Sequence, residues 1–217
     1  MTAKIAPRTP IRAVLWDFGG VLTTSPFEAF NRYEAQVHLP KNFIRRLNSV
    51  NSGANAWARL ERGELSIPQF CAAFEAEAEA AGQQIEGAAV LGCVRGELRQ
   101  DMVRALRVIS KQYKTACLTN NFGSSEDTST DSGATKDVMK LFDMVIESSK
   151  LGHRKPEPAF YHYACNRLQI KPNEAVFLDD LGINLKPART MGMQTIKVIC
   201  SKQALSDLGT CLGHNVT

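Results

Sequence analysis

The sequence predicts an α/β fold in which helices cover both faces of a parallel sheet, with a helical insertion after the first strand. From residue 96 onward, short apolar runs of strand length alternate with segments that carry apolar residues at helical spacing. Between residues 24 and 95 only helical patterns occur, and they follow directly on the first apolar run. Alternating strands and helices are typical of parallel sheets, so we interpret the long helical stretch as an insertion.

The composition limits the classes of function that fit. The chain has 217 residues, of which 44% are hydrophobic and 22% charged, as expected for one globular domain with an insertion. The formal charge is only +4 and no dense block of Lys and Arg occurs. This argues against nucleic acid as the main partner and suits a small anionic substrate. No apolar run approaches the roughly 18 residues of a membrane span, so we expect no membrane partner.

Cysteine usage and the first residues bear on the compartment. The six cysteines contain no C-x-x-C pair, and most lie in apolar runs. We therefore interpret them as small core residues in a reducing, cytoplasmic compartment. Residues 1–12 are basic and lack acids, but no apolar stretch follows that fits a secretion signal. An organellar transit segment and a short disordered tail both fit this stretch, and we favour the tail.

The first strand is predicted at residues 13–16, an unbroken apolar run followed by Asp17 and then by Gly19 and Gly20. A buried strand that ends in a carboxylate and a glycine turn delivers that carboxylate to the edge of the sheet. In parallel sheets this edge binds ligands. An Asp before glycines is also ordinary turn chemistry, so Asp17 taken alone is a weak candidate.

Four helices are predicted in the insertion. Ser25 and Glu28 form a capping box around Pro26, and the helix that follows places Phe27, Phe30, Tyr33 and Val37 on one face. The other three are expected from Pro40, over residues 54–61, and after the capping box Ser66-x-x-Gln69.

The second half of the chain predicts four further strands, each followed or preceded by a helix. The strands are expected at residues 115–118, 144–146, 175–178 and 195–199, and the helices near 102–109, 138–142, from Pro158, and over 184–192. Residues 123–135 are polar and low in complexity, which predicts a mobile loop, and residues 150–158 predict a second loop.

Polar side chains stand at the ends of these predicted strands. Asp17, Thr119 and the pair Asp179 and Asp180 each follow a strand directly, and Lys155 follows the third strand after a loop. Singly, each has an ordinary explanation as a helix cap, a turn residue or a solvated loop lysine. Because the carboxyl ends of parallel strands meet at one edge, we expect all of them to converge.

These residues stand in the segments WDFGGVL, CLTNN, GHRKPEPAFY and FLDDLGINLKPARTMGM. Together the four segments closely resemble the motifs of the haloacid dehalogenase superfamily. The last two segments, and ERGELS followed by PQF, are similar to the amino-terminal phosphatase domain of soluble epoxide hydrolases and its stand-alone relatives. The resemblance covers residues 11–200. It implies a Rossmann-like catalytic core of residues 11–23 and 96–217, with a small helical cap over 24–95.

The resemblance also implies a Mg²⁺-dependent phosphatase, that is, a phosphoric monoester hydrolase. Asp17 would attack phosphorus and form an aspartyl-phosphate, Thr119 would donate to a phosphoryl oxygen, and Lys155 would stabilise the charge of the transition state. Asn120 and the backbone at Gly19 would join Thr119 and Lys155 in binding the substrate.

For the metal, the resemblance implies the carboxylates of Asp17 and Asp180 and the carbonyl of Gly19 as ligands, since Mg²⁺ prefers hard oxygen donors. Asp179 would lie behind these ligands or act as an alternate one. The partner is then a small phosphorylated metabolite. For the assembly, both a monomer and a homodimer stay open.

Gly19 departs from the family pattern, because phosphatases of the superfamily usually carry a second Asp at this position as general acid and base. A positioned acid or base contributes about 10²- to 10⁴-fold to a rate. Substrates with good leaving groups would need it least. A replacement acid from the 123–135 loop, which offers Glu126, Asp127 and Asp131, is one possibility. We expect the glycine turn itself to be crowded.

Three functions from different classes therefore stay open. We favour the Mg²⁺-dependent phosphatase, because the Asp179-Asp180 pair and the Lys155-Pro156 context suit a metal and a phosphate. A metal-independent haloacid-type dehalogenase is the second, since its nucleophile also lacks the second Asp. The third is a catalytically weakened binding or regulatory protein.

Overall fold

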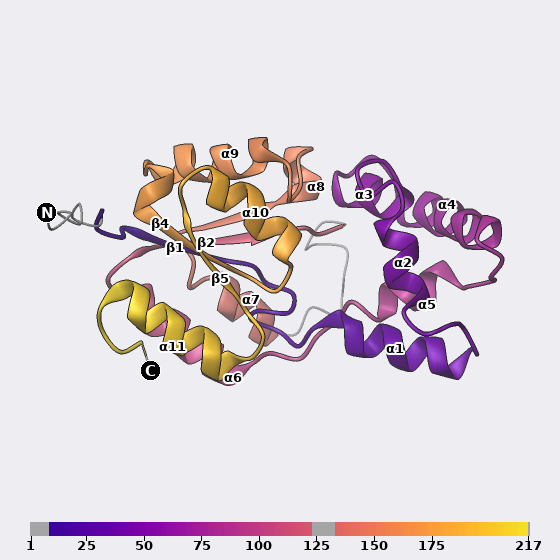
Figure 1. Ribbon diagram of the computed structural model, residues 1–217, viewed down its shortest axis with the longest axis horizontal. Helices are drawn as coiled ribbons and strands as arrows, with labels where there is room; N and C mark the ends of the chain where they lie inside the picture. The colour runs from indigo at the N-terminus through magenta and orange to yellow at the C-terminus, as the bar shows by residue number, and fades with distance from the viewer. Residues whose placement is uncertain (1–8, 123–132, 217) are drawn as a thin grey trace, which may run out of the picture.

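The computed structural model describes residues 9–122 and 133–216, and in these ranges the chain forms a parallel sheet of five strands. The strand order is β3-β2-β1-β4-β5, and every neighbouring pair is parallel (Figure 1). The strands are β1 (Ala13–Trp16), β2 (Lys114–Thr119), β3 (Met144–Glu147), β4 (Ala175–Asp179) and β5 (Gln194–Lys197). The predicted α/β class is confirmed, and the first strand of the chain lies in the centre of the sheet.

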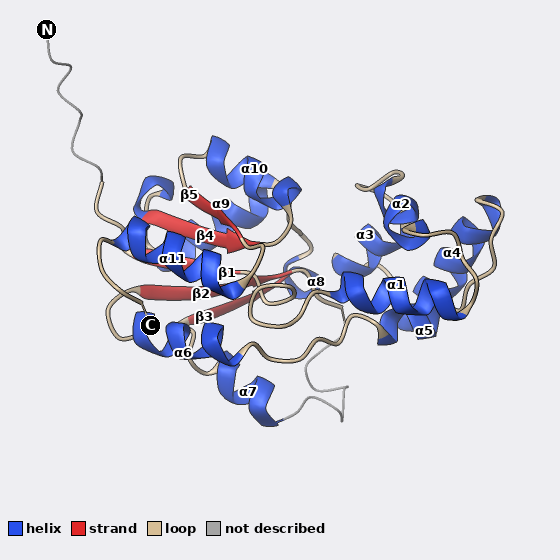
Figure 2. Cartoon of the chain, turned by 60° about the horizontal axis from the view of Figure 1, so that its bottom comes forward, coloured by secondary structure: helices blue, strands red, loops and turns tan. Residues whose placement is uncertain are grey.

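Helices cover both faces of the sheet, because both faces of the strands are apolar (Figure 2). Val14 and Trp16 point to one face, and Ala13 and Leu15 point to the other. The first face packs against α6 (Gln100–Ile109), α7 (Gly133–Met139) and α11 (Ser201–Leu212). The second packs against α9 (Pro158–Leu168) and α10 (Gly182–Thr190). Continuous apolar strands between two helical layers are the expected consequence of a parallel sheet.

Residues 24–95, called the helical segment below, have a hydrophobic cluster of their own. The partly buried Trp57 packs against this cluster, with its ring centroid 5.3 Å from that of Phe70 and 6.2 Å from that of Phe30. The helices are α1 (Pro26–Gln36), α2 (Phe43–Ser49), α3 (Ala56–Glu61), α4 (Ile67–Ala80) and α5 (Gly87–Gly92). The remaining described residues, 9–23, 96–122 and 133–216, are called the sheet-bearing part below. In Figure 1 the helical segment lies at one end of the molecule, where α3 contacts α8 (Ser148–Leu151) of the sheet-bearing part.

The two connections to the helical segment run side by side. Thr23 forms an antiparallel bridge with Leu98, and the Thr24 amide donates to the Glu97 carbonyl at 2.8 Å. At Gly96 an added Cβ would lie 2.5 Å from the Thr24 carbonyl oxygen. The outgoing and the returning connection between the sheet and the helical segment are therefore hydrogen-bonded to each other, and we call this pair of connections the paired crossing.

The structure corrects several local expectations in the helical segment. Ser25 is the N-cap of α1, but its hydroxyl makes no cap hydrogen bond, so the predicted capping box does not form. Val37 is 44% exposed, because α1 ends at Gln36 and the chain turns away there. The second helix begins at Phe43 rather than Pro40, with Asn42 in the left-handed region before it. The capping box at Ser66 is present as predicted.

Other corrections fall in the second half of the chain. Three helices were not predicted: α5 in the helical segment, α8 and α11. Helices α5 and α8 are short, with six and four residues, and α11 buries only a narrow stripe of apolar side chains. Part of the predicted 150–158 loop is thus helical. Of the predicted 123–135 loop, residues 133–135 belong to α7, and residues 123–132 lie outside the described residues. The fifth strand is Gln194–Lys197, shifted toward the N-terminus.

Among the described residues, no helix combines the length and the apolar character needed to cross a membrane.

Candidate active site

Carboxylates from two neighbouring strands meet at one edge of the sheet. Asp17 follows β1, and Asp179 and Asp180 end and follow β4, its hydrogen-bonded neighbour. One oxygen atom from each of the three carboxylates lies within 4.8 Å of the others. Thr119 ends β2, on the other side of β1. The three carboxylates therefore meet as predicted, and Thr119 lies at the end of the strand next to β1.

Lys155 reaches this cluster from the loop before α9. Its Nζ lies 2.7 Å from Asp17 Oδ1 and 2.9 Å from Asp179 Oδ2, and its side chain is only 1% exposed. Burial opposes the charged form, but Asp17 and Asp179 outweigh it and raise the pKa of Lys155 above its ordinary value. Lys155 is therefore a fixed ammonium between two carboxylates. The peptide bond that links it to Pro156 is cis.

Asp17 has one occupied and one open oxygen. Oδ1 accepts from Lys155 and from the Phe18 amide at 2.7 Å, whereas Oδ2 accepts no hydrogen bond from any residue in the described ranges. The Asp17 amide continues the strand pairing and donates to the Leu178 carbonyl at 2.8 Å. The carboxylate is thus held in orientation through one oxygen, and the other is available to a ligand or an electrophile.

The carboxylates of Asp179 and Asp180 differ in how many hydrogen bonds they already accept. Asp179 is fully buried, and its oxygens accept from the Leu181 amide at 2.7 Å, from Asn184 Nδ2 at 3.1 Å and from Lys155. Asp180 is partly exposed, and its Oδ2 accepts from Ser25 Oγ at 3.4 Å. Burial and the neighbouring Asp179 raise the pKa of Asp180 to about 6. Asp180 is therefore the more available ligand of the two.

The charges of the cluster are not balanced, since three carboxylates face one ammonium. Burial raises the pKa of Asp17 well above its usual value, Asp179 and Asp180 add to this, and Lys155 opposes it. A divalent cation offsets such an excess of negative charge, and carboxylate oxygens are the donors that Mg²⁺ prefers. The residues present therefore fit a Mg²⁺ ion.

The glycines after Asp17 play different parts. Gly20 has φ +74°, and an added Cβ would lie 2.2 Å from Asp180 Oδ2. An added Cβ at Gly19 meets no atom within 4 Å. The expectation of a crowded turn is thus wrong at Gly19 and right at Gly20, which leaves room for the Asp180 carboxylate.

Thr119 and Asn120 also differ. Thr119 is half-buried, and across residues 9–122 and 133–216 its hydroxyl has no hydrogen-bond partner, so it is free to donate. The Asn120 side chain is fully engaged: Oδ1 accepts from the Lys155 amide at 2.9 Å, and Nδ2 donates to the Lys155 carbonyl and to Glu61, both at 3.0 Å. A substrate contact by Asn120 would require one of these bonds to open.

Glu61, Arg154 and Ser25 belong to this region and were missed by the sequence reasoning. Glu61 ends α3 in the helical segment and accepts from Asn120 and from Arg154 Nε. No periodicity or motif in the sequence indicates these two contacts, because Asn120 and Arg154 lie 59 and 93 residues from Glu61 along the chain. Ser25 looked like a helix cap, whereas its hydroxyl is directed at Asp180.

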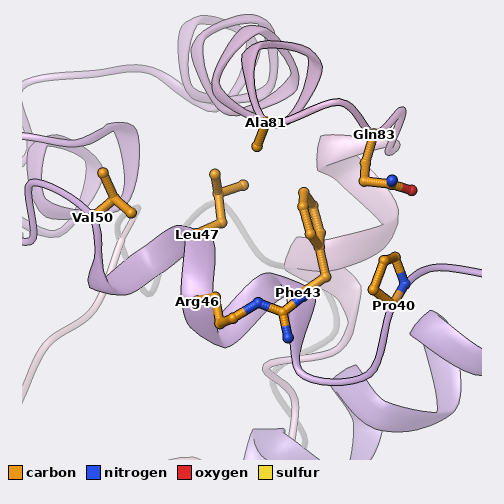
Figure 3. A pocket seen from close by; sticks show the side chains of 7 residues that line it. All are labelled: Pro40, Phe43, Arg46, Leu47, Val50, Ala81 and Gln83. Carbon is orange, nitrogen blue, oxygen red and sulfur yellow. The ribbon is translucent and has the colours of Figure 1, made fainter.

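A groove of about 250 Å³ lies elsewhere, on the helical segment. Phe43 and Leu47 of α2 point toward Ala81 and Gln83 after α4 (Figure 3). None of the three carboxylates or Lys155 lines it. The candidate active site therefore rests on the carboxylate cluster and not on this groove.

Residues 11–192 match the family of haloacid dehalogenase-like hydrolases. The chain is 35% identical over 208 residues to the acyl-CoA dehydrogenase family member 10 of Mus musculus, covering 93% of this chain and 19% of that protein. It is 30% identical over 216 residues to the bifunctional epoxide hydrolase 2 of Mus musculus, covering 94% and 39%. The chain thus spans less than half the length of these two relatives. The sesquiterpene phosphatase astK of Aspergillus oryzae is 25% identical over 211 residues, covering 94% of this chain and 98% of that one.

Solved structures agree on the fold. A dehalogenase superimposes with a TM-score of 0.65 at 20% identity, covering 94% of this chain and 98% of the other. A HAD family enzyme of Bacteroides thetaiotaomicron, in complex with magnesium and inorganic phosphate, gives a TM-score of 0.56 at 18% identity, covering 86% and 93%. With the matched residues covering most of the chain, this protein belongs to the haloacid dehalogenase-like hydrolases.

Proposed function

We propose that the chain is a Mg²⁺-dependent phosphatase that hydrolyses a small phosphorylated metabolite through an aspartyl-phosphate on Asp17. The observation that carries this proposal is the carboxylate cluster, in which Asp17 keeps one oxygen open and Lys155 holds the other. Two of the similar proteins support it: one relative is a sesquiterpene phosphatase, and one structural neighbour was solved in complex with magnesium and inorganic phosphate.

In the proposed reaction Asp17 Oδ2 attacks phosphorus, a bond from this oxygen to phosphorus forms, and the bond from phosphorus to the leaving oxygen breaks. Water then hydrolyses the aspartyl-phosphate and releases phosphate. The Thr119 hydroxyl donates to a phosphoryl oxygen. Lys155 keeps Asp17 oriented and places positive charge beside the phosphoryl group.

The metal would be held by the carboxylates of Asp17 and Asp180 and by the Gly19 carbonyl. When bound, Mg²⁺ lowers the repulsion between the anionic nucleophile and the anionic phosphate. The Asp179 oxygens already accept hydrogen bonds from Lys155, Leu181 and Asn184, so the proposed role of Asp179 is to hold Lys155. As part of the same proposal, residues 11–23 and 96–217 form the catalytic core, and the helical segment is its cap.

The test is hydrolysis of p-nitrophenyl phosphate by the full chain with Mg²⁺ and with EDTA, beside halide release from 2-chloropropanoate. We expect phosphate release that requires Mg²⁺ and no halide release. Phosphate release that is unchanged by EDTA, or halide release without phosphatase activity, would contradict the proposal.

The dehalogenase is the second candidate, and Gly19 is the observation in its favour. The position lacks the carboxylate that phosphatases of the family usually carry, and a solved dehalogenase shares the fold. The same assay pair separates the two reactions. Loss of both activities would favour a binding or regulatory protein instead.

Mg²⁺ binding depends more on Asp180 than on Asp179. We expect Asp180→Ala to weaken Mg²⁺ binding at least about tenfold with little loss of stability, because its carboxylate has one weak partner. We expect Asp179→Ala to lower the free energy of unfolding by about 3 kcal/mol or more, because it leaves the buried Lys155 with a partner missing. Isothermal titration and thermal unfolding of both variants check this. Equal Mg²⁺ affinity of Asp180→Ala and wild type would contradict it.

Mg²⁺ affinity is also expected to fall as the pH drops through about 6, where Asp180 titrates. The raised pKa means that the proton is bound below this value and must leave before the carboxylate can bind metal. Isothermal titration at pH 7.5 and pH 5.0, in two buffers with different ionisation enthalpies, measures affinity and proton release. An affinity that is the same at both pH values would count against Asp180 as a ligand.

Rates should depend steeply on the pKa of the leaving group, because no side chain at Gly19 protonates it. We expect aryl phosphates to be hydrolysed far faster than simple alkyl phosphates, as an unassisted alkoxide leaves poorly. The measurement is log kcat/KM against leaving-group pKa for a series of aryl and alkyl phosphates. A flat line, with chemistry shown to limit the rate, would mean that a general acid is present.

Gly19→Asp is the matching gain of function. Since an added Cβ there meets no atom within 4 Å, the new carboxylate has room, and we expect a shallower slope in the same plot. An unchanged slope in a folded Gly19→Asp variant would show that the new carboxylate does not reach the leaving group.

A further inference from the structure

The helical segment contributes a buried carboxylate to the surroundings of the active site. Glu61 is 8% exposed, although it ends a helix at the boundary with the sheet-bearing part. Its Oε1 accepts from Trp57 Nε1 at 3.1 Å, and its Oε2 accepts from Asn120 Nδ2 at 3.0 Å and from Arg154 Nε. Burial raises the pKa of Glu61, and Arg154 opposes this. A buried carboxylate with this many donors is fixed in place.

Asn120 passes this constraint on to Lys155. Its side chain holds both backbone polar groups of Lys155, the amide through Oδ1 and the carbonyl through Nδ2. The same Nδ2 donates to Glu61, so the plane of the Asn120 amide is set from the helical segment. The backbone of Lys155 in turn fixes the point from which Nζ reaches Asp17 and Asp179.

We infer that Glu61 is a positioning residue of the active site: it acts through Asn120 to hold Lys155 between Asp17 and Asp179. The inference deepens the proposed function and rests on it for its kinetic part. It assigns the helical segment a share in aligning the reacting groups, in addition to covering them. A displacement of about 1 Å in an aligned group costs roughly 10²-fold in rate, so a contact remote from phosphorus can matter.

A second contact across the same boundary supplies the matched control. Arg62 follows Glu61 in the chain and pairs with Glu157 of the sheet-bearing part at 3.2 Å. Within the part of the chain that the structure describes, Arg62 makes no hydrogen bond to Asn120 or Lys155. If Glu61 only fastened the helical segment to the sheet, loss of the Arg62 pair would have the same effect as loss of Glu61.

The kinetic test compares Glu61→Leu, Arg62→Gln, Asn120→Ala and the double variant Glu61→Leu/Asn120→Ala on p-nitrophenyl phosphate with saturating Mg²⁺. Leu removes the oxygen that accepts from Asn120. We expect Glu61→Leu to lower kcat by roughly 10- to 100-fold with KM changed less than about threefold, and Arg62→Gln to change kcat less than about threefold. Because Glu61 acts through Asn120, the double variant should be no slower than Asn120→Ala. Multiplying effects in the double variant, or an equal loss in Arg62→Gln, would overturn the inference.

Hydrogen exchange of the Lys155 amide tests the positioning without any reaction. We expect this amide, which donates to Asn120, to exchange at least about tenfold faster in Glu61→Leu than in wild type and at an unchanged rate in Arg62→Gln. If wild type hydrolyses no phosphate ester, the proposed function fails and this measurement still decides the inference. Unchanged Lys155 exchange in Glu61→Leu would overturn it.

Glu61→Leu leaves Arg154 without its carboxylate, which can destabilise the fold. If Glu61→Leu does not fold, Glu61→Leu/Arg154→Met removes the unpaired charge and takes its place in both measurements. The same losses in kcat and in Lys155 protection are expected. Wild-type values in this variant would contradict the inference.

Discussion

Asp17→Asn is expected to lower kcat for a phosphate ester by at least about 10³-fold while the protein stays folded. Asn is nearly isosteric with Asp, and its carbonyl oxygen can still accept from Lys155 and from the Phe18 amide. The amide is not a nucleophile and forms no aspartyl-phosphate. Lys155 also keeps Asp179 as its second partner, so we expect Tm to change by only a few degrees.

The measurement is kcat of the purified variant under conditions in which wild type is active, together with thermal unfolding. Asp137→Asn is the control, since Asp137 is a surface carboxylate paired with Lys140 at 2.8 Å, and it should behave as wild type. An Asp17→Asn protein that keeps more than a few per cent of wild-type activity would show that Asp17 is not the nucleophile.

Gly20→Ala is expected to lower Mg²⁺-dependent activity by about 10²-fold and Mg²⁺ affinity by at least about tenfold. The new Cβ would lie 2.2 Å from Asp180 Oδ2, so the carboxylate must leave its position. The positive φ of Gly20 adds strain of about 1–3 kcal/mol for any residue with a Cβ.

Gly19→Ala is the matched comparison, because it adds the same atom one residue earlier, where nothing lies within 4 Å. We expect it to lose less than about tenfold in activity, since the proposed ligand at this position is a backbone carbonyl. Titration of Mg²⁺ into both variants and their kcat values check the pair. Equal losses in the two variants would show that the space kept for Asp180 is not what Gly20 provides.

The sheet and the meeting of Asp17, Asp179, Asp180 and Lys155 could be predicted because both follow from local patterns. A short apolar run specifies a strand, and the parallel arrangement brings the residues after such strands to a common edge. The ends of the strands were therefore informative before any distance was known. The same reasoning placed Thr119 at the end of β2, the neighbour of β1, and its hydroxyl is free among the described residues.

What the sequence did not indicate are contacts between distant segments. Ser25 has the pattern of a helix cap, yet its hydroxyl is directed at Asp180, 155 residues away. Glu61 looks like a polar residue at a helix end, yet it is buried against Asn120 and Arg154. No periodicity encodes such partners, because they depend on how the helical segment packs against the sheet. Likewise, the difference between Gly19 and Gly20 depends on where the Asp180 carboxylate lies.

The paired crossing at Thr23–Leu98 has an evolutionary consequence. Since Thr24 and Gly96 lie against each other, everything between them is an excursion that starts and ends at nearly the same point. Another sequence of different length can be grafted at this junction without a change in the register of the strands. Under the proposed assignment of the helical segment as the cap of a catalytic core, new substrate ranges arise by exchange of this one segment while the core residues stay the same. The contact of Glu61 with Asn120 sets one condition on such a graft: the incoming module must present an acceptor to the Asn120 amide.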